Sequence, residues 1–361
     1  FRSLRCRIRR KPVYLQSVLT PMRKDVKKHI ICLTLCLCVL VLAVWLLGKL
    51  TEPKYMSDVK EGAMTAEYYG EKTPHDVIFI GDCEVYENFS PVSMWREKGI
   101  TSYIRGSAQQ LIWQSYHLLE EGFERESPKV VVYNVQAMKY SEPQSEAYNR
   151  MTIDGMPLSE TKLHAIHDSM TEGESVLSYF IPLLRWHSRW SELKAEDFEY
   201  MFTRDRVTVA GYLMQTAVRP MTQLPSAPIL EDPAIGDICW EYLDRIRSLC
   251  ENNGATLILI KSPSLYPHWY DEWDEQVSAY AEKNGLDYIN FLPLADGIGI
   301  DMQTDTYDGG LHLNVYGAEK LGRYFAGILS EKYGVPDRSA DKAIAADWAE
   351  KCAVYDEMRS K

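Results

Sequence analysis

The uncharged run from residue 30 to residue 48 constrains this chain more than any other feature. Nineteen residues without a charge are long enough to cross a bilayer as a helix. Residues 1–29 before it carry ten Lys or Arg and a single Asp, a net charge of +9. Because basic residues flanking a membrane helix stay in the cytoplasm, we expect a single-pass anchor whose N-terminus is cytoplasmic and whose remainder is extracytoplasmic.

A secretory signal peptide is the alternative interpretation of this run. Its apolar region usually spans about 7 to 15 residues and precedes a small-residue cleavage site. Here the run is longer, and Lys49-Leu50-Thr51-Glu52-Pro53 follows it, which favours an uncleaved anchor. The chain begins with Phe1, and Met22, which opens a compact basic segment, is a second candidate start that the sequence leaves open.

Charge and cysteine content exclude several classes of protein. The formal net charge of -11 becomes about -20 beyond residue 29 once the +9 of the first segment is subtracted, which argues against nucleic acid as a partner. The four cysteines beyond the anchor are too few for a disulfide scaffold, and no pair of them has metal-ligand spacing. They are Cys83, Cys239, Cys250 and Cys352. Because the cysteines lack metal-ligand spacing, we predict no metal. Phosphate-loop and dinucleotide glycine motifs do not occur, so we also predict no cofactor.

Beyond the anchor, apolar runs alternate with helical patterns at a spacing typical of a parallel α/β sheet. Expected strands lie at residues 77–81, 101–104, 128–134, 256–261 and 288–291. Expected helices lie at residues 91–98, 109–124, 238–252, 271–284 and 312–333. Strands that alternate with helices in this way predict a three-layer fold with right-handed crossovers.

The alternation of strands and helices stops between residues 141 and 233. These residues contain helical pieces at 160–169 and 174–193 but no buried strand, so we interpret them as an insertion. Together with the anchor, this divides the chain into five expected segments. The expected segments are a basic cytoplasmic segment (1–29), a transmembrane helix (30–48), a stalk (49–74), the α/β domain with its insertion (75–335) and a helical C-terminal tail (336–361).

Two stretches carry candidate chemistry. Cys83 follows the apolar run 77–80 and the turn Gly81-Asp82, which places it at the carboxyl edge of the sheet, where ligands bind in such folds. A small buried hydrophobe is the alternative for a free cysteine. His312 lies in a glycine-rich loop before the last helix, with Asp305 and Asp308 upstream, as expected of a general base oriented by a carboxylate. A structural histidine is the alternative.

An aromatic segment follows the expected strand 256–261. Tyr266, Trp269 and Trp273 alternate with acidic residues on the same edge of the sheet. They suit a platform on which a sugar stacks, and equally a lid that packs on the sheet.

These residues resemble the SGNH or GDSL-type hydrolases, a family with a flavodoxin-like, three-layer fold. Gly81-Asp82-Cys83 is similar to the family's Gly-Asp-Ser turn, and Gly106, Asn134 and His312 are similar to its three later motifs. The amino-acid sequences of residues 79–91 and 305–321 resemble those of a membrane-anchored branch of this family in Firmicutes. That branch is distantly similar to proteins that acylate or deacylate cell-surface polymers. The resemblance implies that Cys83 is the nucleophile and His312 the base. It implies an oxyanion site made by the Cys83 and Gly106 amides and the Asn134 side chain.

Two positions depart from the family pattern. Cys83 stands where the family has serine, and Gly309 stands three residues before His312, where the family has aspartate. A thiolate is a competent nucleophile. Asp308 or Asp305 must then orient the imidazole, and we prefer Asp308 because two glycines let it fold back onto the ring.

The resemblance implies a membrane-anchored esterase or acyltransferase acting on acyl groups of a cell-envelope glycan or another acylated polymer, with a membrane-bound acyltransferase as a candidate partner. The alternative is a catalytically silent binding or scaffold protein of the envelope. The sequence leaves the acyl group and the choice between hydrolysis and transfer open.

Overall fold

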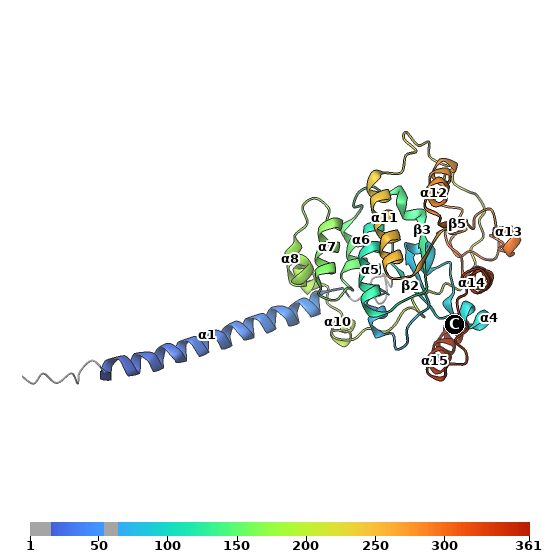
Figure 1. The fold of residues 1–361 in the computed structure, drawn as a ribbon. Coiled ribbons are helices and arrows are strands. Elements are labelled where there is room, and N and C mark those ends of the chain that lie inside the picture. Colours follow the sequence, from blue (N-terminus) through green and yellow to red (C-terminus); the bar gives the residue numbers. More distant parts are fainter. Residues whose placement is uncertain (1–15, 54–63) are drawn as a thin grey trace, which may run out of the picture. The chain divides into compact units, whose positions relative to one another are not determined.

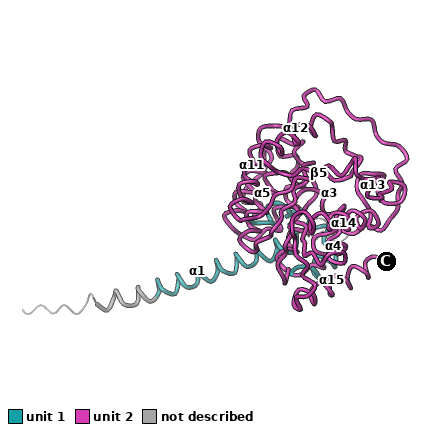
Figure 2. The backbone as a smooth tube through the Cα atoms, turned by 45° about the vertical axis from the view of Figure 1, so that its right-hand side comes forward, with its two compact units in different colours: residues 1–53, 180–202 teal, residues 54–179, 203–361 magenta. Residues whose placement is uncertain are grey.

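The computed structural model describes residues 16–53 and 64–361, and side chains from residue 25 onward. The described residues form two compact units (Figure 2). Unit 1 contains residues 16–53 and 180–202, and unit 2 contains residues 64–179 and 203–361. Residues 1–15 of the expected cytoplasmic segment and 54–63 of the expected stalk lie outside the description.

Unit 1 is built on the long helix α1 (Gln16–Thr51). Its stretch Asp25–Thr51 is long and apolar enough to cross a membrane, and an 18-residue window within it has a mean hydropathy of 3.1 and is not buried inside the protein. The expected span 30–48 therefore lies within a longer helix. Three short elements pack against its C-terminal end. They are α9 (Pro182–Trp186), η4 (His187–Ser191) and α10 (Ala195–Glu199).

Unit 2 contains a five-stranded parallel sheet in the order β2-β1-β3-β4-β5 (Figure 1). The strands are β1 (Val77–Gly81), β2 (Ser102–Gly106), β3 (Val130–Asn134), β4 (Thr256–Lys261) and β5 (Asp287–Asn290). All four strand pairs are parallel. The predicted α/β fold class and all five strands are confirmed.

Helices cover both faces of this sheet (Figure 1). One face carries α5 (Ile112–Arg125), α11 (Asp237–Asn252) and α12 (Asp271–Asn284), and the other carries α4 (Pro91–Lys98) and α14 (Val315–Glu331). Because no face meets water, β1, β2 and β3 are buried at every position, which explains their uninterrupted apolar runs. Phe79 of β1 packs against Phe89 and Phe325 in this core.

The insertion differs from the single helix expected at 174–193. Three short elements replace it: α8 (Val176–Phe180), α9 and η4. The break falls before Pro182, which begins α9 because proline has no N–H to donate within a helix. The other elements of the insertion are α6 (Glu146–Ile153) and α7 (Glu160–Ser169).

The folded body extends beyond the expected limits 75–335 at both ends. Residues 64–74, expected in the stalk, include α2 (Met64–Glu67) and η2 (Tyr68–Gly70), and the Glu67 carboxylate accepts a hydrogen bond from the Val207 amide at 2.7 Å. The expected tail forms α15 (Lys342–Ser360), whose Trp348 stacks on Trp95 of α4 with ring centroids 5.1 Å apart. Both segments therefore belong to unit 2.

Candidate active site

Cys83 stands at a sharp strand-to-helix turn at the carboxyl end of β1. Gly81 has φ of 152°, and a Cβ there would lie 3.1 Å from the Asn134 Cβ, so the turn requires glycine. Asp82 then caps α3 (Cys83–Tyr86) by accepting a hydrogen bond from the Glu84 amide at 3.2 Å. The turn leaves the half-buried Cys83 at the edge of the sheet where ligands bind in this class of fold.

His312 is held by Asp308 from the loop before α14. One Asp308 oxygen lies 2.8 Å from the ring Nδ1, and the other accepts a hydrogen bond from the His312 backbone amide, also at 2.8 Å. Gly309 and Gly310 between them have φ of 82° and 98°, which lets the aspartate fold back on the ring. Asp305 is engaged elsewhere, because its Oδ2 accepts hydrogen bonds from Lys320 Nζ at 2.6 Å and from the Asp301 amide at 2.8 Å.

Glu87 is a second carboxylate on the same ring nitrogen, and sequence reasoning missed it. Its Oε2 lies 3.0 Å from His312 Nδ1. Tyr307 donates to both Glu87 oxygens, at 2.9 and 2.8 Å, and its ring stacks on the His312 ring at 6.1 Å between centroids. Glu87 follows Cys83 by four residues, which is one helical turn, and that spacing was the available signal.

The two carboxylates set the electrostatics of His312. Burial favours the neutral ring, but Cys83, Glu87 and Asp308 outweigh it and raise the pKa of His312 well above its ordinary value. Because Nδ1 faces the carboxylates, the other nitrogen, Nε2, remains for chemistry. Nε2 is buried and makes no hydrogen bond of regular geometry among the described residues.

Cys83 and His312 lie close enough for each to shift the pKa of the other. Burial and the neighbouring Asp82 raise the pKa of the Cys83 thiol to about 11, although His312 acts in the opposite direction. The free thiol is therefore protonated at neutral pH, and a thiolate forms only with help from the imidazole. The sequence-predicted Cys83, His312 and Asp308 are brought together in this structure.

A buried ionic layer lies directly under the Cys83 turn. Lys261 Nζ is 2.9 Å from both oxygens of Glu84, and the Asn134 amide nitrogen donates to Glu84 at 3.0 Å and to Asp82 at 3.1 Å. Both Nδ2 hydrogens of Asn134 are thus used. In this structure the amide therefore donates to buried carboxylates, which must be satisfied, and not into the oxyanion site in which the sequence analysis expects it. Burial and Glu84 raise the pKa of Asp82 to about 6.

Gly106 pairs with Gly81 in the sheet, and the helix α3 lies over it. A Cβ on Gly106 would stand 3.1 Å from side-chain atoms of Val85 and Tyr86. Glycine at this position therefore permits α3 to approach the end of β2, next to the cysteine turn.

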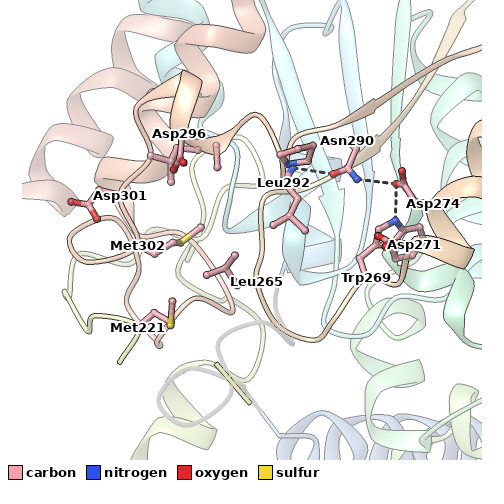
Figure 3. A pocket seen from close by; sticks show the side chains of 13 residues that line it. Met221, Leu265, Trp269, Asp271, Asp274, Asn290, Leu292, Asp296, Asp301 and Met302 are labelled. Carbon is pink, nitrogen blue, oxygen red and sulfur yellow. Dashed lines mark hydrogen bonds between the residues drawn. The ribbon is translucent and has the colours of Figure 1, made fainter. Parts of the chain in front are cut away.

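A cavity of about 720 Å³ opens beside Gly310 of the His312 loop. Figure 3 shows the residues that line it. Its walls include Leu265 and Met221, and the Leu265 amide donates to the Gly310 carbonyl at 2.8 Å. Four aspartates line it without a lysine, arginine or histidine: Asp271, Asp274, Asp296 and Asp301. Within residues 16–53 and 64–361, no group of three or more His, Cys, Asp or Glu is arranged to hold a metal ion.

The predicted aromatic platform is only partly open. Trp269 and Trp273 are each 9% exposed and pack together at 5.4 Å between ring centroids, whereas Tyr266 is 41% exposed. Trp269 lines the cavity, and its Nε1 donates to Asp274 at 3.0 Å (Figure 3). The tryptophans serve mainly as packing, which agrees with the lid alternative for these two residues.

No protein-family model matches the sequence, and no curated protein is similar to it in sequence. Among solved structures, the chain is similar to a protein of Bacteroides fragilis described as a "putative acylhydrolase", with 12% identity and a TM-score of 0.37. The match covers 74% of this chain and 95% of that one.

Proposed function

We propose that unit 2 is an esterase or acyltransferase that works through Cys83, with His312 as base and Asp308 as its orienting group. The observation that carries this proposal is the array at the carboxyl edge of the sheet. There the Cys83 thiol adjoins His312, and two carboxylates hold Nδ1 of the ring and leave Nε2 available. A nucleophile, a base and a group that orients the base are the parts that acyl transfer requires.

The proposed reaction starts from the neutral His312 ring and the Cys83 thiol, so a ring that is protonated at rest first loses its Nε2 proton to water. Nε2 then takes the Cys83 proton as the sulfur attacks the acyl carbonyl of an ester. The tetrahedral intermediate collapses when the alkoxide leaves with the proton returned by Nε2, and a thioester remains on Cys83. Water or a second hydroxyl then loses a proton to Nε2 and attacks the thioester, which frees the thiol. The backbone amides of Cys83 and Gly106 are the proposed donors to the oxyanion.

The proposed substrate is an acylated cell-envelope glycan or similar polymer. The cavity beside the His312 loop is large enough for a sugar-sized group, and the exposed Tyr266 ring stands in the same segment as Leu265 of its wall. The absence of basic residues from this lining favours a neutral or cationic group over an anionic one.

The proposed location is the outer face of a cell membrane, with α1 as the anchor. The +9 charge of residues 1–29 supports a cytoplasmic N-terminus. A membrane-bound acyltransferase is the partner that would supply or accept acyl groups at such a site. Protease added to intact cells should digest unit 2, and full protection of unit 2 would contradict this topology.

Trapping of the acyl group on sulfur tests the proposal. The full-length protein in detergent is mixed with p-nitrophenyl acetate, and the acylated peptides are identified by mass spectrometry. Cys352 is the matched control because it is also a half-buried free thiol of unit 2, on α15. We expect a thioester on Cys83 that His312→Ala abolishes, with no acylation of Cys352. Equal labelling of both, or none on Cys83, would refute the nucleophile assignment.

A catalytically silent binding protein is the second candidate, and one observation favours it. Burial and Asp82 raise the pKa of the Cys83 thiol to about 11, which disfavours the thiolate. In that case the cavity binds its ligand without turnover, and Cys83→Ala leaves binding unchanged. Turnover that depends on Cys83 excludes this candidate.

A further inference from the structure

Residues 180–202, which we call the collar, fold with α1 although more than 120 residues separate the two in sequence (Figure 2). A Cβ on Gly48 would lie 3.6 Å from Pro182 Cδ, and the rings of Trp45 and Phe202 stack at 5.8 Å. Arg189 Nη1 donates to the Thr51 carbonyl at 2.6 Å. These contacts fix the collar to the last two turns of α1.

The collar exposes large apolar side chains. Leu184, Trp190, Phe198 and Phe202 are 52%, 72%, 60% and 65% exposed. Six of the 23 collar residues are aromatic, against 11% of the whole chain. Single exposed apolar residues are ordinary, but four of them on so short a segment mark an interaction surface.

The polar groups of the collar suit the boundary between lipid and water. Arg189 is tied to Asp197 by an ion pair at 3.0 Å, and the Arg185 guanidinium lies 4.5 Å from the centre of the Trp186 ring. Tryptophan and arginine are the residues that settle at this boundary, with an apolar body in lipid and a polar end in water.

The collar also lies at the position along α1 where the boundary between lipid and water is expected. Apart from Val26, which lies between Asp25 and Lys27, the exposed large apolar side chains of α1 run from Ile30 to Leu47. These eighteen residues span about 27 Å at 1.5 Å each, close to the roughly 30 Å core of a bilayer. The collar packs where this run ends. A bilayer that surrounds α1 would therefore meet the collar at its headgroup region.

We infer that the collar is a second membrane contact, with Leu184, Trp190 and Phe198 inserted into the headgroup region of the bilayer that α1 crosses. This inference rests on the proposed membrane anchoring. The lipid surface is favoured over a protein partner because the collar and α1 form one unit, so lipid around the helix reaches the collar without any further component.

Quenching by brominated lipid tests the inference on the full-length protein. The protein is reconstituted in phosphatidylcholine vesicles, with or without lipid brominated at carbons 6 and 7, and the contribution of one tryptophan is the difference between wild type and its Phe variant. We expect the Trp190 contribution to fall by at least half in brominated vesicles. The Trp240 contribution should not change, because Trp240 lies in unit 2, stacked on Tyr280.

Trp45 separates failure of the inference from failure of the anchor. If Trp45 is quenched by brominated lipid but Trp190 is quenched only by aqueous iodide, the anchor is in the bilayer and the collar inference is overturned. Resistance of Trp190 to both quenchers overturns it as well. If neither Trp45 nor Trp190 responds to brominated lipid, the membrane anchoring itself fails. Phe198→Trp in the Trp190→Phe background supplies a second reporter, for which the same quenching is expected.

Discussion

Replacing Lys261 with methionine should destabilise unit 2 strongly. The Lys261 side chain is 0% exposed, its Nζ lies 2.9 Å from both Glu84 oxygens, and it donates to the Ser262 carbonyl at 2.8 Å. Glu84 is itself 1% exposed. Methionine fills a similar volume but leaves this carboxylate buried, with the Asn134 amide at 3.0 Å as its remaining side-chain donor within residues 64–361. Leaving a buried charge without its partner lowers the free energy of unfolding by about 3 to 5 kcal/mol.

Thermal unfolding of the detergent-solubilised protein, followed by near-ultraviolet circular dichroism, measures this cost. A loss of about 3 to 5 kcal/mol should lower the Tm by on the order of 10 °C. The matched control is Lys332→Met, which breaks the Lys332–Asp287 pair at 2.6 Å, where the two side chains are 54% and 42% exposed. Such a surface pair contributes about 0 to 1 kcal/mol.

The double variant Lys261→Met/Glu84→Gln decides whether the stranded charge is the cause. Removing both charges should recover at least half of the loss, because the two residues act as one unit. If Lys261→Met behaves like Lys332→Met, the reasoning is refuted, since Glu84 would then be protonated or hydrated in the folded protein. If the double variant is as unstable as the single one, packing rather than charge explains the loss.

Three further changes have defined outcomes. Glu87→Gln removes one carboxylate from the ring nitrogen and should lower the pKa of His312, as seen in the pH titration of its ring by NMR; an unchanged pKa would contradict the role of Glu87. Burial opposes ionisation of Glu71, but its basic neighbours His75 and Lys351 lower the pKa of this carboxyl to about 2. The ionised carboxylate therefore stabilises the folded protein above pH 4.5, and this contribution is lost as the pH falls toward 2. Glu71→Gln should therefore flatten the acid side of the Tm profile, and an unaltered profile would contradict this. Trp348→Ala empties the stack on Trp95 and should cost about 3 to 5 kcal/mol in urea unfolding, whereas a cost below about 1 kcal/mol would show that α15 does not stabilise unit 2.

The sheet could be predicted from the sequence because its signals are local. The run of residues 77–80 is apolar throughout, since helices cover both faces, and Gly81 marks its end. The carboxyl edge then follows from the parallel order of the strands. This is why the sequence alone could place Cys83 at the edge of the sheet.

The chemistry around the edge could be predicted only in part. Glycines next to His312 showed that Asp308 could fold back, but the role of Asn134 depends on carboxylates of another element. Its amide hydrogens go to Asp82 and Glu84, and no local pattern shows which acceptors a side chain will find across a sheet. Glu87 was missed although its spacing of one helical turn from Cys83 was a local signal, because the His312 ring that it contacts comes from a distant part of the chain.

The docking of α15 was hidden for a different reason. Its buried face includes Asp347 and Lys351, so the helix carries little of the apolar periodicity that marks a buried helix. Lys351 lies 2.8 Å from Glu71, a residue nearly 300 positions earlier in the chain. In the sequence, a charged residue whose partner lies so far away along the chain cannot be told from one that faces solvent.

The division of the chain between the units also determines how the protein responds to cleavage. The chain passes from one unit to the other three times, after residue 53, before residue 180 and after residue 202. A single cut between residues 53 and 64 would therefore not by itself separate unit 2 from α1. The larger fragment would keep the collar, and the contacts of Pro182, Arg189 and Phe202 with α1 would hold the two fragments together as a non-covalent complex. Release would require both a broken backbone and a displaced collar.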